Sequence, residues 1–255
     1  MFERRLWVLT TMALLAVGLQ WAPVRAQRNQ PIYPAYDGFL KNPDGSYTLS
    51  FAYFSHNADT VTIPSGADNA FSPAPGDRHQ PITFHPGHHR FQCVIVLGPE
   101  FDGKLRWTLA YAGTSTATSQ NMLQSNWNLV EGAAEMRMVD FAKAPKGVCL
   151  NRPPTVEVLG LSGRGRGVAG AVTVRMGEAV NLFGNVEDEG LPRTGILSIA
   201  WKQVSGAGTV TFSNPSAART HASFSAPGAY QLELSATDSE FSRSTRVNVT
   251  VTAVR

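Results

Sequence analysis

The chain has 255 residues, with 22 Lys and Arg against 19 Asp and Glu and a formal net charge of +3. So small a net charge argues against a protein that attracts nucleic acid through a strong electrostatic field. Only 16% of the residues are charged, and Thr, Ser, Val, Gly and Pro are abundant. This composition favours β-structure over helix, and the length suits two domains of ordinary size.

The first 26 residues have the pattern of a secretion signal. A charged start at residues 3–5 precedes an apolar run over residues 6–19, and Val24-Arg25-Ala26 supplies the small residues of a cleavage site. A membrane anchor is the alternative, but the run is shorter than the roughly 20 apolar residues of a spanning helix. We therefore expect cleavage after Ala26. The mature chain would be secreted or periplasmic, carry a net charge of +1 and contain no membrane span.

A first β-sandwich domain is predicted over residues 32–130. Asn42-Pro43-Asp44-Gly45 is a turn sequence, because Pro presets its backbone angle and Asp-Gly tolerates the left-handed conformation. Residues 66–86 are rich in Gly, Pro, Asp and Asn and are predicted to be mostly loop. Alternation of apolar and polar residues predicts strands at 47–54, 60–63, 90–97 and 104–111.

A linker is predicted over residues 131–150. Residues 131–140 are compatible with a helix, which would be too short to be stable alone. Asn151-Arg152-Pro153-Pro154 then marks the domain boundary, because two prolines stiffen the chain and end the preceding element.

The only two cysteines, Cys93 and Cys149, both follow the signal and would meet an oxidising compartment. An even count there predicts one disulfide, which would tie the linker back to the first domain. Two buried free thiols are the alternative.

The second predicted domain covers residues 151–254. The stretch from Ala222 to Asp238 is its strongest signal, because Tyr230, Leu232 and Leu234 alternate with polar residues as in a half-buried strand. Further strands are predicted at 155–158, 172–174, 179–183, 198–203, 208–212, 222–224, 230–236 and 243–251.

These motifs resemble the polycystic-kidney-disease (PKD) type of immunoglobulin-like domain found in bacterial secreted and surface proteins. The resemblance is carried by Asn151-Arg-Pro-Pro-Thr-Val, Gly177-Glu-Ala-Val-Asn-Leu-Phe-Gly, Val186-Glu-Asp-Glu-Gly-Leu-Pro, Ile199-Ala-Trp-Lys-Gln-Val-Ser-Gly and Pro227-Gly-Ala-Tyr-Gln-Leu-Glu-Leu-Ser-Ala-Thr-Asp. The loop over residues 160–170 departs from it by being longer and more basic. The first domain resembles uncharacterised secreted bacterial β-domains only vaguely, and no activity follows from that.

Two aromatic residues of the second domain have predicted structural roles. Trp201 is expected to fill the core of the sandwich, where a large ring buries much apolar area. Tyr230 is expected to form the tyrosine-corner contact that such sandwiches use. The fold class is therefore all-β, with two β-sandwich domains in tandem after a cleaved signal.

Four histidines gather in the Pro- and Gly-rich part of the first domain: His79, His85, His88 and His89. Histidine is a common metal ligand, but Pro86-Gly87 forbids the helix of a zinc-peptidase motif. The alternative is a solvent-exposed turn.

Glu187, Asp188, Glu189 and Asp238 form the best-defined acidic group, on two loops that could meet at one end of the sandwich. Carboxylates suit calcium, and these four residues are its candidate ligands. Turn formation is the alternative, because the spacing matches no dedicated calcium loop.

Other short motifs are weaker. Arg164-Gly165-Arg166-Gly167 is expected to be a loop rather than an RNA-binding tract, and Asn248-Val249-Thr250 matches a glycosylation acceptor by chance. Phe71, Phe101 and Trp127 are candidates for stacking on sugar rings, with core packing as the alternative.

The sequence predicts a non-catalytic secreted protein that binds protein or polysaccharide at the cell surface, without a cofactor. It contains no Gly-x-Ser-x-Gly elbow and no phosphate loop, although carboxylate pairs for sugar hydrolysis need not be close in sequence. A spacer without its own ligand is the alternative, which the PKD-type resemblance implies, and a hydrolase is the third.

Overall fold

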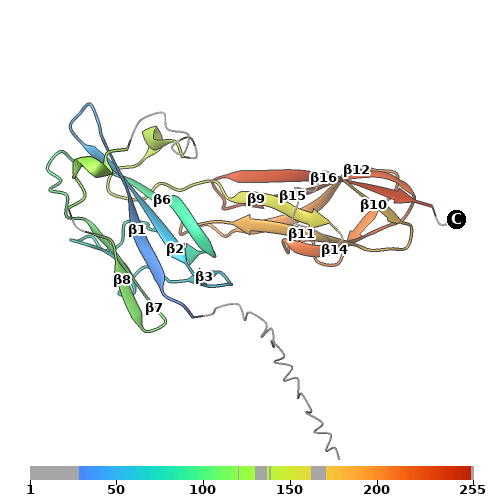
Figure 1. Ribbon diagram of the computed structural model, residues 1–255. Coiled ribbons are helices and arrows are strands. Elements are labelled where there is room, and N and C mark those ends of the chain that lie inside the picture. Colours follow the sequence, from blue (N-terminus) through green and yellow to red (C-terminus); the bar gives the residue numbers. More distant parts are fainter. Residues whose placement is uncertain (1–28, 120, 130–136, 138, 162–170, 254–255) are drawn as a thin grey trace, which may run out of the picture.

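The computed structural model describes residues 29–119, 121–129, 137, 139–161 and 171–253 (Figure 1). Within these ranges the protein is all-β, with two short 3-10 helices, η1 (Ser125–Trp127) and η3 (Phe141–Lys143). The strands are β1 (Ile32–Lys41), β2 (Tyr47–Ser55), β3 (Val61–Thr62), β4 (Asn69–Ser72), β5 (Thr83–Phe84), β6 (Gly87–Leu97), β7 (Arg106–Tyr111), β8 (Thr114–Ala117), β9 (Thr155–Leu161), β10 (Ala171–Arg175), β11 (Val180–Glu187), β12 (Ser198–Gly206), β13 (Val210–Phe212), β14 (Arg219–Phe224), β15 (Gly228–Thr237) and β16 (Ser242–Thr252).

Three sequence predictions fall outside the described residues. These are the signal peptide over residues 1–26, most of the candidate helix over residues 131–140, and the basic loop that holds Arg164 and Arg166. Among the described residues, no helix has the length and apolar character needed to cross a membrane.

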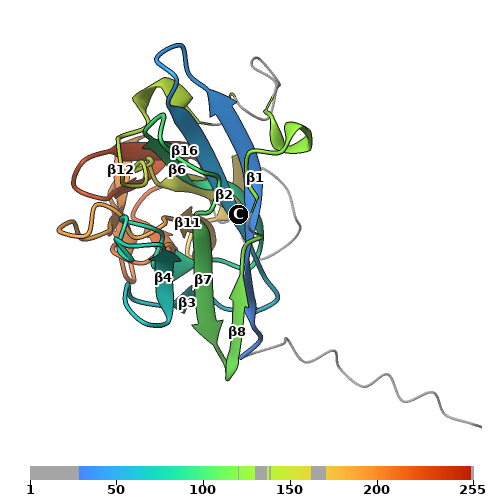
Figure 2. The same cartoon turned by 90° about the vertical axis from the view of Figure 1, so that its left-hand side faces the viewer.

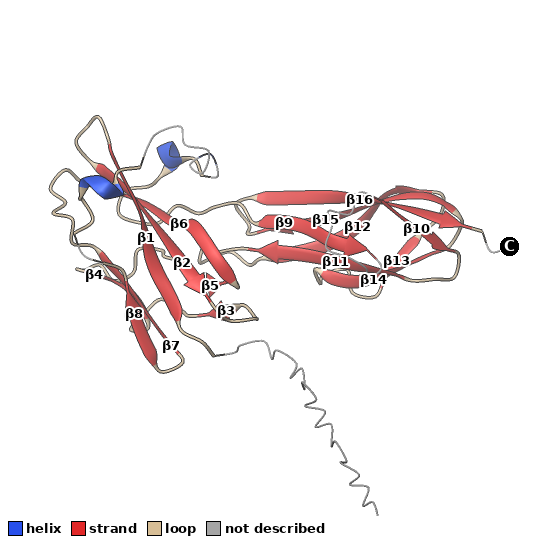
Figure 3. Cartoon of the chain, in the orientation of Figure 1, coloured by secondary structure: helices blue, strands red, loops and turns tan. Residues whose placement is uncertain are grey.

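The first domain packs two three-stranded sheets face to face, in the orders β1-β2-β6 and β4-β7-β8 (Figures 2 and 3). Phe51 on β2 meets Phe71 on β4 and Trp107 on β7, with ring centroids 5.2 and 6.4 Å apart. All three rings are buried. The core therefore sits between the sheets, as the alternating residues of β2 predict.

The described part of the predicted linker lies against the first domain. Cys149 is bonded to Cys93 on β6, with Cα atoms 4.8 Å apart, so the predicted disulfide is confirmed. Val139 packs on Phe91 and Val94, on the opposite face of β6 from the sandwich core. This segment continues the first domain instead of hanging free.

The second domain is a sandwich of two four-stranded sheets, in the orders β10-β16-β15-β12 and β13-β14-β11-β9. Trp201 is 3% exposed, and its ring nitrogen donates to the carbonyl of Ala218 at 3.0 Å. Tyr230 Oη donates to the carbonyl of Ala226 at 2.6 Å. Both aromatic residues therefore have the structural roles that the sequence predicted.

Four short or irregular strands of the first domain were missed. Strands β4 and β5 lie inside the predicted loop over residues 66–86, and β8 follows β7 through a tight Ala112-Gly113 turn. Strand β1 escapes the alternation test because its register shifts between Tyr36 and Gly38. Short edge strands carry too few residues for a periodic signal.

Candidate functional site

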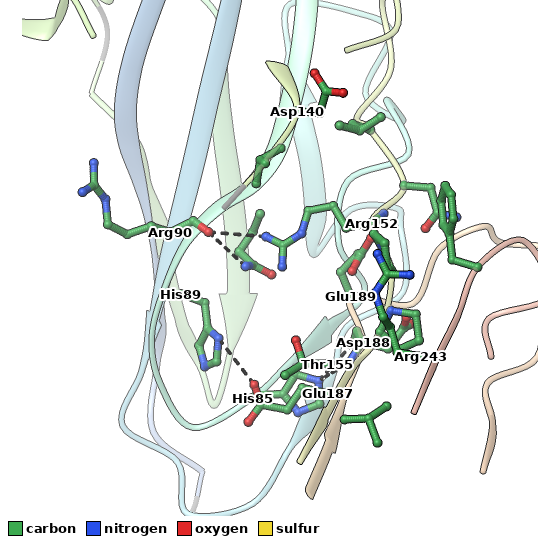
Figure 4. A pocket seen from close by; sticks show the side chains of 18 of the residues that line it. His85, His89, Arg90, Asp140, Arg152, Thr155, Glu187, Asp188, Glu189 and Arg243 are labelled. Atoms are coloured by element: carbon green, nitrogen blue, oxygen red, sulfur yellow. Dashed lines mark hydrogen bonds and ion pairs between the residues drawn. The ribbon is translucent and has the colours of Figure 1, made fainter. Parts of the chain in front are cut away.

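The two domains meet end to end, and a cleft of about 760 Å³ lies at their junction. Its lining combines the start of β6, the segment around Arg152, the loop after β11 and the start of β16 (Figure 4). We call the junction of the two domains, with the residues that contact each other across it, the joint. Clefts between domains are common ligand sites, which makes this one the candidate functional site.

A bulge in β6 forms the first-domain wall of the joint. The pairing of β2 with β6 is interrupted between Phe51 and Tyr53, and Phe91 adopts a positive φ of 56°. Asp37 holds this bulge from one side, accepting from the amide of Phe91 at 2.7 Å and from Arg90 Nε at 2.8 Å.

Arg152 holds the same bulge from the side of the second domain. Its Nη1 donates to the carbonyl of Phe91 at 2.9 Å, and its own amide donates to Glu189 Oε1 at 2.6 Å. The residue thus links the bulged strand of one domain to the acidic loop of the other. The bulge re-aims the strand at this point, and Arg152 Nη1 also donates to the carbonyl of Arg90 at 3.4 Å, so two carbonyls of β6 accept from the neighbouring domain.

The acidic loop after β11 makes the closest backbone contacts between the domains. The carbonyl of Glu189 accepts from the amides of Ile82 and Thr83, at 3.0 and 3.2 Å. Gly190 follows with a φ of +84°, and a Cβ there would lie 2.5 Å from Cγ1 of Ile82. A glycine is required here by both the backbone angle and the close approach.

Two of the four predicted histidines make contacts at this loop. His85 Nε2 is 2.9 Å from the carbonyl of Asp188 and 3.1 Å from its amide, so either tautomer of the neutral ring gains one hydrogen bond. His89 stacks on Tyr53, and its Nδ1 is 3.9 Å from Glu187 Oε2. His88 and His79 are exposed. His85 and His89 are therefore parts of the joint rather than of a solvent-exposed turn.

The joint also contains an ion pair between the two domains. Arg193 Nη2 lies 2.8 Å from Asp77 Oδ1 and also donates to the carbonyl of Gln80 at 3.3 Å. Arg193 follows the acidic loop, whereas Asp77 and Gln80 belong to the loop before β5. Two segments more than a hundred residues apart in sequence are thus fixed to each other.

Two carboxyl groups are buried where the domains meet. Asp188 is 6% exposed and Glu189 is 3% exposed. Burial raises the pKa of Asp188 to about 6, against a smaller lowering by the amide of Gly190, and the pKa of Glu189 to about 7, against a smaller lowering by Arg152. Desolvation penalises the charged form, so both groups bind protons more readily than ordinary carboxyls.

The acidic group predicted from sequence is brought together only in part. Asp238 accepts from the amides of Glu240 and Phe241 at 2.8 and 2.6 Å, which is the turn role that the sequence left open. Among the described residues, no group of three or more His, Cys, Asp or Glu side chains is arranged to hold a metal ion. The calcium hypothesis for Glu187, Asp188, Glu189 and Asp238 stays untested.

The aromatic candidates of the first domain pack inward. Phe71 is 3% exposed and lies in the core, which is the packing role that the sequence analysis gave as the alternative to stacking on sugar rings. Phe101 and Trp127 are partly buried and also pack against the core, through Tyr47 and Tyr36 respectively. Sandwich cores recruit aromatic rings for their area, and sequence alone does not say which face they take.

The arginines of the joint were not singled out from the sequence. Arg152 stands within the Asn-Arg-Pro-Pro motif and Arg193 follows a proline, but neither position signals a long-range partner. Their role depends on which first-domain carbonyls and carboxylates lie opposite.

Known proteins support the type of the second domain. Residues 169–251 match a family described as "K319L-like, PKD domain". The second sandwich is therefore a PKD-type domain, as its motifs predicted.

Several solved structures show a broad likeness to the chain. Drosophila N-cadherin EC1-3 is 12% identical, with 87% of this chain and 68% of that chain covered and a TM-score of 0.29. Fibronectin(III)-like modules of Clostridium thermocellum CbhA are 10% identical over 86% and 94% of the two chains, with a TM-score of 0.28. Titin domains z1z2, solved in complex with telethonin, are 9% identical over 90% and 100%, also at 0.28. TM-scores this low carry no conclusion about function.

Proposed function

We propose that the protein is exported and acts without catalysis, by binding a protein or polysaccharide at or near the cell surface. In this proposal the PKD-type domain, residues 151–254, is a stalk that holds the first domain, residues 32–130, in one orientation. The joint is the observation that carries the proposal. It combines backbone hydrogen bonds from Glu189, the Arg152 contacts to the β6 bulge and the Arg193–Asp77 ion pair.

A fixed orientation favours binding, because a preorganised surface loses less conformational entropy when it meets its partner. The disulfide supports export, since such bonds persist in oxidising compartments. The same stiffness favours a spacer without its own ligand as the second candidate. A hydrolase is less supported, because Asp188 and Glu189 are buried against the opposite domain and their raised pKa values have that structural cause.

The test begins with the exported chain. N-terminal sequencing of the mature protein should find Gln27 at its start, and retention of residues 6–19 in the product would contradict export by cleavage. The purified mature chain is then applied to an array of purified bacterial surface polysaccharides and to purified surface proteins. Saturable binding to one of them is expected. Its absence across both sets would favour the spacer.

A variant of the joint tests whether the fixed domain orientation contributes to binding. Arg193→Ala removes the ion pair to Asp77 and should weaken binding if orientation matters, whereas Arg219→Ala, at an exposed position of β14, is the matched control. Equal binding by both variants would show that the joint does not contribute to recognition.

A further inference from the structure

A second pocket, of about 670 Å³, lies in the first domain away from the joint. We call it the Arg78 pocket; its lining includes Asp44, Pro73, Arg78, Phe101 and Lys146. It lies between the loop that follows β4 and the segment that runs into the disulfide at Cys149. None of the joint residues named above lines this pocket.

The backbone of Arg78 is held on both sides. Its amide donates to Gln80 Oε1 at 2.8 Å, and its carbonyl accepts from the amide of Cys149 at 2.6 Å. Gln80 is fully buried and itself donates to the carbonyl of Asn69 at 2.8 Å. The position of Arg78 is therefore set by the core of the domain and not by a free loop.

The guanidinium of Arg78 is buried without a charged partner. The residue is 8% exposed, and its Nη atoms donate only to the carbonyls of Gly147 at 3.2 Å and Ala74 at 3.5 Å. Its Nε is buried and has no hydrogen-bond partner. No carboxylate among the described residues forms an ion pair with it.

This arrangement is costly in the free protein. An arginine stays charged in proteins and has five N–H donors, and a buried charge is ordinarily paired. Burial lowers the pKa of Arg78, which records the same cost. An external anion that reached the pocket would supply the missing counter-charge, with a fork geometry that suits a carboxylate.

The rim of the pocket limits which anion can enter. Asp44, Glu100 and Asp102 are exposed there, and two of them keep local partners: Asp44 accepts from the amide of Ser46, and Asp102 pairs with Lys104 at 3.2 Å. Lys146 also lines the pocket and acts on Asp44, so three carboxylates stand against one further lining cation, and a polyanion would meet net negative charge at the rim. A single carboxylate flanked by basic groups would complement both the floor and the rim.

We propose that the Arg78 pocket binds one carboxylate of a partner protein, from an Asp or Glu side chain or a chain terminus, with basic residues beside it. The carboxylate pairs with Arg78, and the basic neighbours face Asp44, Glu100 and Asp102. Phe101 and Pro73 contact the aliphatic part of the inserted segment. This inference rests on the proposed binding function and selects a protein partner over an acidic polysaccharide.

The mature chain, with ¹⁵N-labelled arginine, tests the proposal by NMR. The Arg78 Nε–H signal is assigned by its loss in Arg78→Lys. Acetyl-Lys-Glu-Lys-amide should shift it saturably, and acetyl-Lys-Gln-Lys-amide should bind about tenfold more weakly or not at all, because a hydrogen-bonded charge is lost. No shift with the Glu peptide, or equal shifts with both peptides, would overturn the proposal.

A third probe, an oligogalacturonate, distinguishes the ligand class. Binding of the sugar acid more tightly than the Glu peptide would refute the assignment to a protein partner. Arg78→Lys should keep the fold and lose most of the affinity, while Arg219→Gln should behave as the unchanged chain. The comparison of peptides on the unchanged chain stands even if a variant fails to fold. The probes are independent of the natural partner, so a negative result here and a negative array result are separate failures.

Discussion

The amide of Arg152 donates a hydrogen bond of 2.6 Å to Glu189 Oε1, while the carbonyl of Glu189 accepts from Ile82 and Thr83. Glu189 thus contacts Arg152, at the start of the second domain, through its side chain and the first domain through its backbone. Such a hydrogen bond contributes about 1 kcal/mol, or about 1.5–3 kcal/mol when the carboxyl is ionised, so its loss should be measurable at the joint.

Glu189→Ala should loosen the joint. The side-chain acceptor for Arg152 disappears, and the two domains should tumble more independently, which ¹⁵N relaxation measures as diverging rotational correlation times. Glu189→Gln keeps an acceptor oxygen at the same place and is the matched control. Identical correlation times in the Ala variant and the unchanged chain would show that the backbone contacts alone fix the orientation.

The joint should be more stable in acid than in base. Asp188 and Glu189 have folded-state pKa values of about 6 and about 7, above the ordinary values of 3.8 and 4.5. Between those limits the folded protein binds more protons than the unfolded chain, so stability falls as pH rises. The contribution of these two protonated carboxyls to stability is fully present below about pH 4 and is lost as pH passes through 6 and 7.

The measurement is the melting temperature at pH 5 and pH 8, compared with that of Glu189→Gln. The variant does not titrate at this position and should show a smaller loss between the two values. A loss of the same size in both proteins would show that Glu189 does not carry the pH dependence.

Trp201→Ala should destabilise the second domain strongly. The ring is almost fully buried, stacks on Phe212 and hydrogen-bonds Ala218. Removing such a ring costs about 3–5 kcal/mol, a large part of the roughly 5–15 kcal/mol that a domain has. Urea unfolding of the mature chain should show an earlier transition for this domain. An unchanged midpoint would place Trp201 outside the core, which its burial argues against.

Loss of the disulfide should destabilise the first domain. Cys93 and Cys149 are 56 positions apart, and closing a loop of that length contributes about 4 kcal/mol in the chain-entropy model. The double replacement Cys93→Ser with Cys149→Ser should therefore lower the urea midpoint of the first domain. The PKD-type domain serves as the internal control and should unfold as before. A shift confined to that second domain would contradict the prediction.

Tyr230→Phe isolates one hydrogen bond of the second domain. The ring stays in the core against Phe224, while the donor to the carbonyl of Ala226 is removed. A loss of about 1 kcal/mol is expected, with Trp201→Ala as the larger reference change. A loss as large as that of Trp201→Ala would mean that the ring itself had moved.

The sequence by itself determined the fold class, most strands of the second domain and the disulfide. Strand period is local, so the alternation through Tyr230, Leu232 and Leu234 predicted a half-buried strand before any contact was known. The PKD-type motifs likewise predicted that Trp201 lies in the core of the second sandwich. With only two cysteines present, a single pairing was available.

Only the tertiary structure decided the joint, the irregular strands and the two pockets. Asp188 and Glu189 could be read as calcium ligands or as a turn because their neighbours across the joint, Ile82, His85 and Arg152, come from distant segments. Arg78 was not singled out from the sequence, because its lack of a carboxylate partner among the described residues depends on how distant segments fold together. Such relations have no sequence period, since they arise where loops of separate domains or separate sheets happen to meet.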